Sequence, residues 1–236
     1  TKYKEVLTFT TDFTRLKDMD YILIFVSTPM VKDRLSIINV ISALEASAVV
    51  NNKATYIIMS TLPVGEMRHI HDIFSDIRLF YCPPMVRQGN FLSTFTNPPS
   101  GQQLIGYNHK SDFDSDVNSD IIDLYKFWLN KEVAINVVPE NVAEIAKLCI
   151  NMMLATKIII ANSIAKWVDN KLNADLICQI VNHDPRIGTG YFTPGGPAAG
   201  RCLPRDIIEL ENAAADTDLS KLLKVLNEIN KTRDLI

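Results

Sequence analysis

The stretch Tyr21-Ile-Leu-Ile-Phe-Val26 is an unbroken apolar run of β-branched, aromatic and leucine side chains. A strand of this composition is typical of a parallel sheet that is covered on both faces. Two similar runs follow, Thr55–Ser60 and Ile77–Tyr81. Helical patterns separate the three runs, at Leu35–Val50 and Glu66–Phe74. Strands that alternate with helices at this spacing imply crossover connections, so the sequence predicts an α/β fold built on a parallel sheet.

Two more strands extend the predicted sheet, at Leu104–Tyr107 and Val133–Val138, with a helix between them at Ile121–Leu129. The stretch 96–103 (Thr-Asn-Pro-Pro-Ser-Gly-Gln-Gln) and the acid-rich stretch 110–120 carry the polar and turn-forming residues of loops. We therefore expect these two stretches to connect the sheet elements at the surface.

The organisation changes after Pro139, because no Pro or Gly occurs between Glu140 and about Asn170. Glu140 and Glu144 place negative charge where a helix N-terminus favours it. A helix of about 30 residues would be about 45 Å long, and such a helix often lies between lobes or between subunits. Its segment Leu148–Ile164 is apolar almost all round, so we expect burial on most faces.

The chain is thus predicted to form two domains, a sheet domain of residues 1–138 and a helical domain of residues 139–236. Three shorter helices are expected in the second domain after the long one, at Ala174–Asn182, Leu203–Ala215 and Leu219–Thr232.

Composition and charge exclude several classes of function. The 236 residues carry a formal net charge of −3 and no run of Lys and Arg, so we predict no nucleic-acid partner. The longest uninterrupted apolar runs are far too short to span a bilayer, and we predict no membrane association. The four cysteines form no C-x-x-C pair and no His lies at zinc-ligand spacing from them, so no metal site is predicted. They are typical of reduced thiols, and we expect a cytoplasmic protein.

The stretch Gly200-Arg-Cys-Leu-Pro-Arg-Asp206 places Cys202 at the predicted start of a helix. A thiol at a helix N-terminus lies near the positive end of the peptide dipoles and beside free backbone N–H groups. Both features favour the thiolate, which is the nucleophilic form. The alternative is a buried structural cysteine at a loop–helix junction, since free Cys is among the most buried residue types.

Three other positions are candidates for a site. Lys147 and Asn151 are four residues apart and share one face of the long helix, where a lysine among apolar neighbours needs a partner; the alternative is that Lys147 extends to solvent. Arg186, in the loop Asp184-Pro-Arg-Ile-Gly188, could bind a phosphate or carboxylate, or could be an ordinary surface residue. Ser60-Thr61 ends a buried strand, where open parallel sheets bind ligands, or could simply cap the next helix.

Two familiar signatures are missing from the sequence. No G-x-G-x-x-G follows a strand and opens a helix, so the usual dinucleotide fingerprint is absent. The four histidines do not cluster along the chain, and a histidine-based triad is unsupported.

Several motifs nevertheless occur in a telling order along the chain. They are Asp20-Tyr-Ile-Leu-Ile-Phe-Val-Ser-Thr-Pro29, Ser60-Thr-Leu-Pro-Val-Gly65, Cys82-Pro-Pro-Met-Val-Arg-Gln-Gly89, Ala143-Glu-Ile-Ala-Lys-Leu-Cys-Ile-Asn151 with Leu154–Lys157, and the loops Asp184–Gly188 and Gly200–Asp206. Together they resemble the nucleotide-sugar 6-dehydrogenases, the family of UDP-glucose and GDP-mannose dehydrogenases. The resemblance implies a Rossmann-like sheet, a helical domain whose 140–170 helix pairs two subunits, NAD as cofactor and a nucleotide sugar as substrate.

The resemblance also implies a reaction and a role for each candidate. The sugar C6 alcohol would be oxidised twice, to a carboxylate, with Cys202 forming first a thiohemiacetal and then a thioester. Lys147 would stabilise the developing oxyanion, and Asn151 and Asp206 would orient water and polar groups. Thr61 would position water or cofactor, and Arg186 would reach the substrate. The residues expected to contact cofactor are Thr28, Pro29, Thr61 and Arg205.

The sequence also departs from the family pattern. The family's first β-α-β unit, with its glycine fingerprint, would lie before Thr1, and its C-terminal nucleotide-binding domain after Ile236. Pro84 and Gln88 stand where the family has glutamates, and Pro197-Ala-Ala-Gly200 replaces Gly-Phe-Gly-Gly. Two alternatives to an enzyme follow: a catalytically degenerate dehydrogenase fold kept for a structural or interaction role, and a nucleotide-sugar binding module without turnover.

Overall fold

The computed structural model describes residues 8–87, 89–108, 119–168, 170–188 and 190–231. The chain divides into two compact units. The first, called here the sheet unit, comprises residues 1–28 and 37–143, and the second, the helical unit, comprises residues 29–36 and 144–236. The chain therefore passes from one unit to the other three times along the sequence. The sequence does not anticipate that residues 29–36 belong with the helices.

The sheet unit is built on five strands in the order β1-β4-β5-β6-β7. Their bounds are Tyr21–Ile24, Thr55–Ile58, Arg78–Tyr81, Gln102–Tyr107 and Ala134–Pro139. β1, β4 and β5 are mutually parallel, and β6 is parallel to β7, as the sequence predicts. β6 is antiparallel to β5, which corrects the expectation of a wholly parallel sheet. Among its described residues, the segment that joins these two strands contains one short helix, α3 (Phe91–Thr96), and the chain re-enters the sheet without a full crossover.

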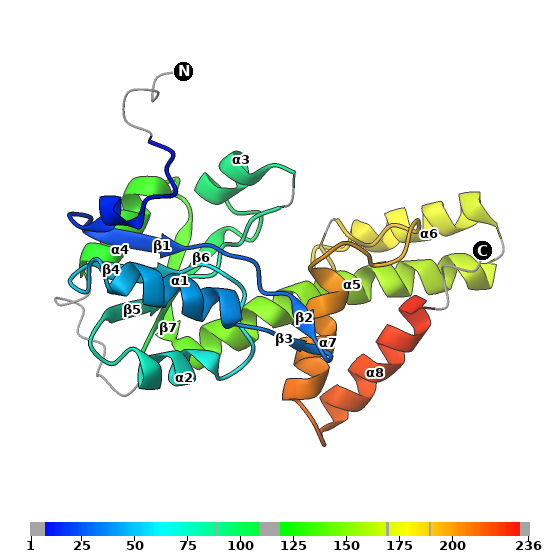
Figure 1. Cartoon of the computed structure of the whole chain (residues 1–236). Coiled ribbons are helices and arrows are strands. Elements are labelled where there is room, and N and C mark those ends of the chain that lie inside the picture. Colours follow the sequence, from blue (N-terminus) through cyan, green and yellow to red (C-terminus); the bar gives the residue numbers. More distant parts are fainter. Residues whose placement is uncertain (1–7, 88, 109–118, 169, 189, 232–236) are drawn as a thin grey trace. The chain divides into compact units, whose positions relative to one another are not determined.

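Helices cover both faces of this sheet (Figure 1). α1 (Ile38–Ala48) and α2 (Glu66–Ile73) lie on one face and α4 (Ser119–Trp128) on the other. Ile57 and Phe80 of the sheet pack with Ile121 and Tyr125 of α4 in one buried cluster. Covering both faces explains why all four residues of β4 are buried, and hence why its sequence is continuously apolar.

The predicted elements are found with boundaries shifted by a few residues. α1 begins three residues later than predicted, and β6 begins at Gln102, inside the stretch expected to be a loop. α3 occupies the start of that same stretch, and a short 3₁₀ helix at Phe13–Leu16 was not predicted. Most of the stretch 110–120, expected to be a surface loop, lies outside the described residues.

A hydrogen-bonded side-chain pair joins His71 of α2 to the first residue of α5 (Glu140–Val168). His71 Nε2 lies 2.9 Å from Glu140 Oε1 and 3.1 Å from Oε2, and Glu140 is buried. A carboxylate out of water needs such a partner, so this contact fixes α2 against the point where the long helix begins.

In its described residues the helical unit contains most of α5, three further helices and a small β-hairpin. The helices are α6 (Lys171–Asn182), α7 (Leu203–Ala213) and α8 (Asp218–Lys231), and α7 packs against α8. The hairpin pairs β2 (Met30–Val31) with β3 (Arg34–Leu35), and β3 contacts α7 (Figure 1). Lys32 and Asp33 both have positive φ, the conformation of a tight type I′ turn between antiparallel strands.

The long helix begins at Glu140, as predicted, and its 29 residues are close to the predicted length of about 30. The expected burial on most faces is wrong for this chain by itself, because Met153, Ile160 and Trp167 are exposed. These residues recur every seven positions and so lie along one face. α5 is also long and apolar enough to cross a membrane by composition, which uninterrupted runs alone did not reveal, and one third of its most apolar window is buried.

Two asparagines fix the irregular segment that precedes α7. Asn162 of α5 accepts from the Gly195 N–H at 2.9 Å and donates to the Gly196 carbonyl at 3.0 Å. Asn230 of α8 makes the same two-way pairing with the backbone of Ala198, at 2.9 Å each. Each side-chain amide forms one hydrogen bond with a backbone N–H and one with a backbone carbonyl, as a paired strand would. The loop is therefore hydrogen-bonded although it has no regular secondary structure.

We predict that Gly106→Ala destabilises the sheet unit. A Cβ at this position in β6 would lie 2.9 Å from the Tyr81 carbonyl oxygen and 3.2 Å from the Ala143 Cβ. Because the first contact is with backbone, the strand must shift, and we expect a loss of about 1–3 kcal/mol in the free energy of unfolding. Urea denaturation measures it. Gly196→Ala is the control, since a Cβ there meets nothing within 4 Å; equal stability of the two variants would contradict the prediction.

Candidate functional site

Cys202 occupies the N-cap position of α7, where the Gly- and Pro-rich sequence predicts a helix to begin. Its carbonyl accepts the first helical hydrogen bond, from the Asp206 N–H at 2.9 Å, and Pro204 lies in the first turn. The side chain is exposed, so the alternative of a buried structural cysteine is wrong. The thiol is therefore accessible to a reagent and lies at the positive end of the helix dipole.

The carboxylate of Asp206 is fully buried beneath this cysteine and has two side-chain donors. Asn151 Nδ2 of α5 donates to Oδ2 at 2.6 Å, and Arg205 Nε donates to Oδ1 at 2.8 Å. A buried carboxylate with a charged donor on one oxygen and an amide on the other is compensated. Asp206 therefore ties the first turn of α7 to the middle of α5.

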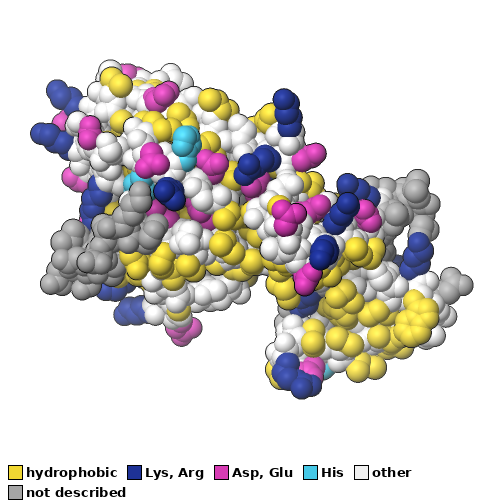
Figure 2. Space-filling model, turned by 90° about the horizontal axis from the view of Figure 1, so that it is seen from below, with side chains coloured by type: hydrophobic (Ala, Val, Ile, Leu, Met, Phe, Trp, Pro, Cys, Tyr) yellow, Lys and Arg dark blue, Asp and Glu magenta, His cyan; other side chains and the backbone are white. Residues whose placement is uncertain are grey.

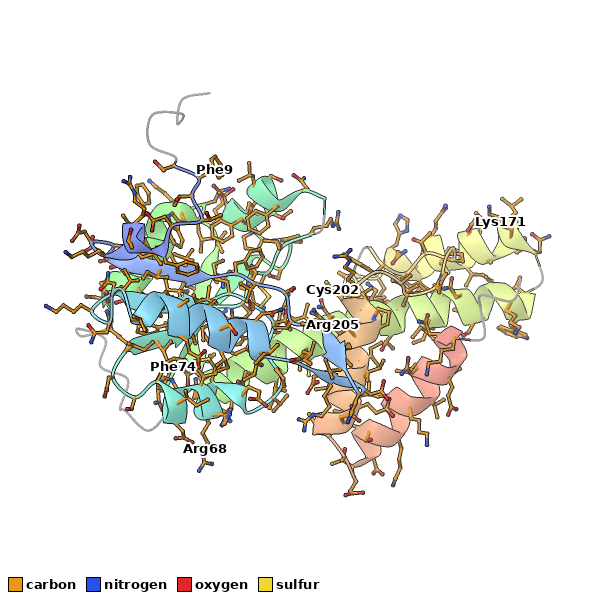
Figure 3. All side chains as sticks on the ribbon, viewed as in Figure 1. Phe9, Arg68, Phe74, Lys171, Cys202 and Arg205 are labelled. Atoms are coloured by element: carbon orange, nitrogen blue, oxygen red, sulfur yellow. The ribbon has the colours of Figure 1, made fainter. Side chains whose placement is uncertain are left out.

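Lys147, one turn before Asn151 on α5, is only 9% exposed, so the alternative in which it extends to solvent is wrong. Burial lowers the pKa of its ammonium group; attraction to Asp206 and Cys202 opposes that shift, and repulsion from Arg205 adds to it. The structure thus brings five predicted residues together in the helical unit, Cys202, Lys147, Asn151, Arg205 and Asp206. Figure 3 labels Cys202 and Arg205 at the start of α7.

Two other predicted residues lie at one edge of the sheet unit. Thr28 follows β1 and Thr61 follows β4, and these parallel strands end in register at Ile24 and Ile58. Ser60 Oγ accepts from the Val26 N–H and donates to its carbonyl, both at 2.8 Å. Ser60 therefore joins the two strand ends. It does not cap α2, whose N-cap is Gly65 without a side-chain cap.

The remaining predicted positions are less informative. Arg186 is on the surface, 86% exposed, and its Nε donates to Asp184 Oδ1 at 2.9 Å within the same turn. The hydrogen bond between the two side chains raises the pKa of Arg186 and lowers the pKa of Asp184. Pro29 is exposed and begins the hairpin segment. Gln88 lies outside the described residues.

Sequence reasoning missed Glu209, whose side chain is fully buried on α7. It is one turn beyond Asp206 and next to Leu210, on the buried face of the helix. The sequence could have revealed it, because Glu209 lies at helical spacing among apolar residues of the buried face, and a carboxylate there needs a partner in the interior. Among the described residues no group of three or more His, Cys, Asp or Glu side chains could hold a metal ion.

Both parts of the chain match models of a known protein family. Residues 1–129 match the NAD binding domain of the UDP-glucose/GDP-mannose dehydrogenase family, and residues 141–232 match its central domain. The chain belongs to this family. The family assignment predicted from the motifs is thereby confirmed.

A UDP-glucose 6-dehydrogenase of Streptococcus pneumoniae is 31% identical over 224 residues, which are 92% of this chain and 55% of that protein. An uncharacterized protein of Methanocaldococcus jannaschii is 31% identical over 85% of this chain. The UDP-glucose dehydrogenase of Pyrobaculum islandicum superposes with a TM-score of 0.79 at 22% identity, covering 98% of this chain and 55% of that one. The chain thus spans about half the length of the UDP-glucose dehydrogenases that it matches, and the α/β fold is confirmed.

The residues present fit part of what the family's cofactor requires. The carboxyl edge of β1 and β4, with Thr28 and Thr61, is where open parallel sheets bind dinucleotides. The 236-residue sequence has no G-x-G-x-x-G to surround a pyrophosphate. Residues 1–129 match an NAD binding domain, and Thr28 and Thr61 lie at the edge where such a domain would bind its dinucleotide.

We predict that Lys147→Met raises the free energy of unfolding at neutral pH. Because the folded pKa of Lys147 lies below its ordinary value of 10.5, the unfolded chain binds more protons between those two values. Stability of the unsubstituted protein should then rise with pH across this window, and the advantage of the variant should shrink toward pH 10.5. Urea denaturation across that range measures it.

The control is Lys166→Met, at an exposed position on the same helix, which keeps Lys147 and should therefore retain the pH dependence of the unsubstituted protein. A Lys147→Met variant that is less stable than the unsubstituted protein, by the same amount at every pH, would contradict the prediction.

Proposed function

We propose that this chain provides the catalytic cysteine of an NAD-dependent nucleotide-sugar 6-dehydrogenase that converts a sugar C6 alcohol to a carboxylate. The observation that carries the proposal is the cluster around Asp206. An exposed thiol at a helix N-terminus, a buried lysine and a buried carboxylate–amide pair converge from two helices of the central domain. Perturbed ionisable groups beside an accessible nucleophile are typical of a catalytic site.

Each side chain then has a role that follows from its position. Cys202 attacks the carbon of the intermediate aldehyde and forms a thiohemiacetal, and Lys147 stabilises the negative oxygen that develops. When bound, NAD accepts a hydride from the sugar carbon in each of the two oxidations. Cys202 then holds that carbon as a thioester, until water adds, the C–S bond breaks and the thiol returns with release of the carboxylate. Asn151 and Asp206 orient that water.

Cofactor and substrate contacts complete the proposal. Thr28, Pro29 and Thr61 would contact NAD at the carboxyl edge of the sheet, and Arg205 is assigned to the cofactor by family resemblance. Arg186 would bind the nucleotide sugar through its guanidinium group, which requires it to exchange its contact with Asp184 for the ligand. Four free cysteines are consistent with a reducing cytoplasm.

The charge on Lys147 gives a test that does not require turnover. If its ammonium attracts the Cys202 thiolate, Lys147→Met should slow alkylation of Cys202 by iodoacetamide about three- to tenfold at neutral pH, because the reaction proceeds through the thiolate. Mass spectrometry of the alkylated peptides measures it. Lys166→Met is again the control, and an unchanged rate in Lys147→Met would remove the main support for the site.

Turnover is tested directly with UDP-glucose and NAD, by counting NADH against glucuronate. The proposal predicts two NADH for each carboxylate and loss of both in Cys202→Ala. A protein that alkylates as predicted, yet gives no turnover, would support the alternative of a degenerate dehydrogenase with a structural role.

We also propose that two copies of the chain pair through α5 and α6. The exposed apolar residues of α5 form one stripe, and Leu172, Leu176 and Ile180 of α6 form another at four-residue spacing. Trp167, 83% exposed, lies near the end of α5. Figure 2 shows hydrophobic side chains gathered on the surface of the helical unit. Such a surface marks an interface, and the family resemblance makes a second copy the occupant.

Light scattering should therefore give the mass of a dimer, and the double variant Met153→Glu with Ile160→Glu should give a monomer, because four charges would face each other in the interface. Phe127→Glu, which places one charge on an exposed apolar residue of the sheet unit, is the control and should remain dimeric. A monomeric unsubstituted protein would overturn the proposal.

A further inference from the structure

The hairpin segment Pro29–Ser36 is continuous with the proposed cofactor residue Thr28, yet it belongs to the helical unit. Its contacts are with α7, the helix that begins at Cys202. The contact between the hairpin and α7 therefore also holds Pro29, the first residue of the hairpin segment.

Glu209 of α7 makes the main contact with the hairpin. The Leu35 N–H of β3 donates to Glu209 Oε2 at 2.8 Å, and the Arg34 guanidinium lies 4.0 Å from Oε1. One turn later on the helix surface, Asn212 Nδ2 donates to the Asp33 carbonyl at 2.7 Å. A fully buried carboxylate that accepts a backbone N–H makes a charge-assisted hydrogen bond, stronger than a neutral one.

The next hydrogen bond along the hairpin reaches Pro29. The Ser36 N–H donates to the Pro29 carbonyl at 2.8 Å, directly after the residue that Glu209 binds. On the other side, Asn39 of α1 donates to the Ser27 carbonyl at 2.9 Å. The segment Ser27–Pro29 is thus fixed at both ends, by α1 and by the hairpin.

We propose that Glu209 is a positioning residue: through Leu35 and Ser36 it sets the backbone of Pro29, and so links the helix of the nucleophile to the segment that contacts cofactor. The catalytic meaning of this link rests on the proposed function, but the link itself does not.

The test is amide hydrogen exchange of the full chain, followed residue by residue by NMR. Glu209→Leu removes the acceptor, and exchange should become at least about tenfold faster at Leu35, since one hydrogen bond contributes roughly that factor. Exchange at Ser36 should also rise, although its N–H donates to Pro29 and makes no hydrogen bond with Glu209, because only a link through the hairpin would loosen it.

Two variants and one internal reference complete the design. Glu209→Gln keeps an oxygen acceptor and should restore slow exchange at both amides, whereas Glu211→Gln on the same helix should change neither. The amides of α8, in the helical unit that contains Glu209, report whether a variant has unfolded as a whole, and they should stay protected.

Faster exchange at Leu35 with none at Ser36 would reduce Glu209 to a local contact and overturn the proposal, as would unchanged exchange at both. Loss of dehydrogenase activity in Cys202→Ala bears on the proposed function and leaves these exchange rates untouched, so the two proposals fail separately.

Discussion

The buried carboxylate of Asp206 is the constraint on which the helical unit depends. It lies in the first turn of α7 and accepts hydrogen bonds from Asn151 of α5 and from Arg205 of its own helix. Its charge also attracts the ammonium group of Lys147. A buried carboxylate is costly unless its oxygens accept hydrogen bonds, as those of Asp206 do from Asn151 and Arg205. Because the partners come from two helices, the same interaction that compensates the charge also fixes where Cys202 begins α7.

Other polar side chains near Asp206 have a different role, because they form hydrogen bonds with backbone that has no regular secondary structure. Asn162 and Asn230 pair with the loop that leads to Cys202, and Glu209 with Asn212 pairs with the hairpin that follows β1. In each case a side chain, buried or half-buried except for the exposed Asn212, forms a hydrogen bond with a peptide group of the irregular segment. Irregular segments can then be ordered where a site needs them.

The sequence of α5 contributes both to the polar candidate site and to an apolar exposed face. Its N-terminal part contributes Lys147 and Asn151 to the candidate site, while its exposed face at Met153, Ile160 and Trp167 is apolar. A helix that serves a polar site and an apolar interface shows a weak separation of faces, which is why its pattern suggested burial all round. The same composition makes it resemble a membrane-spanning helix, although Lys147, Asn151 and Asn162 each meet a partner within the protein.

The sequence by itself determined what local pattern can determine. Apolar runs located β1, β4 and β5, the absence of Pro and Gly located α5, and glycine and proline located Cys202 at the start of α7, because each depends on residues within a turn or two. Motif order supplied the family. What only the tertiary structure decided was the antiparallel pairing of β6, the exposure along α5, and the hairpin bound to Glu209. Leu35 and Glu209 are 174 residues apart, and no local periodicity records which distant partner a buried carboxylate will meet.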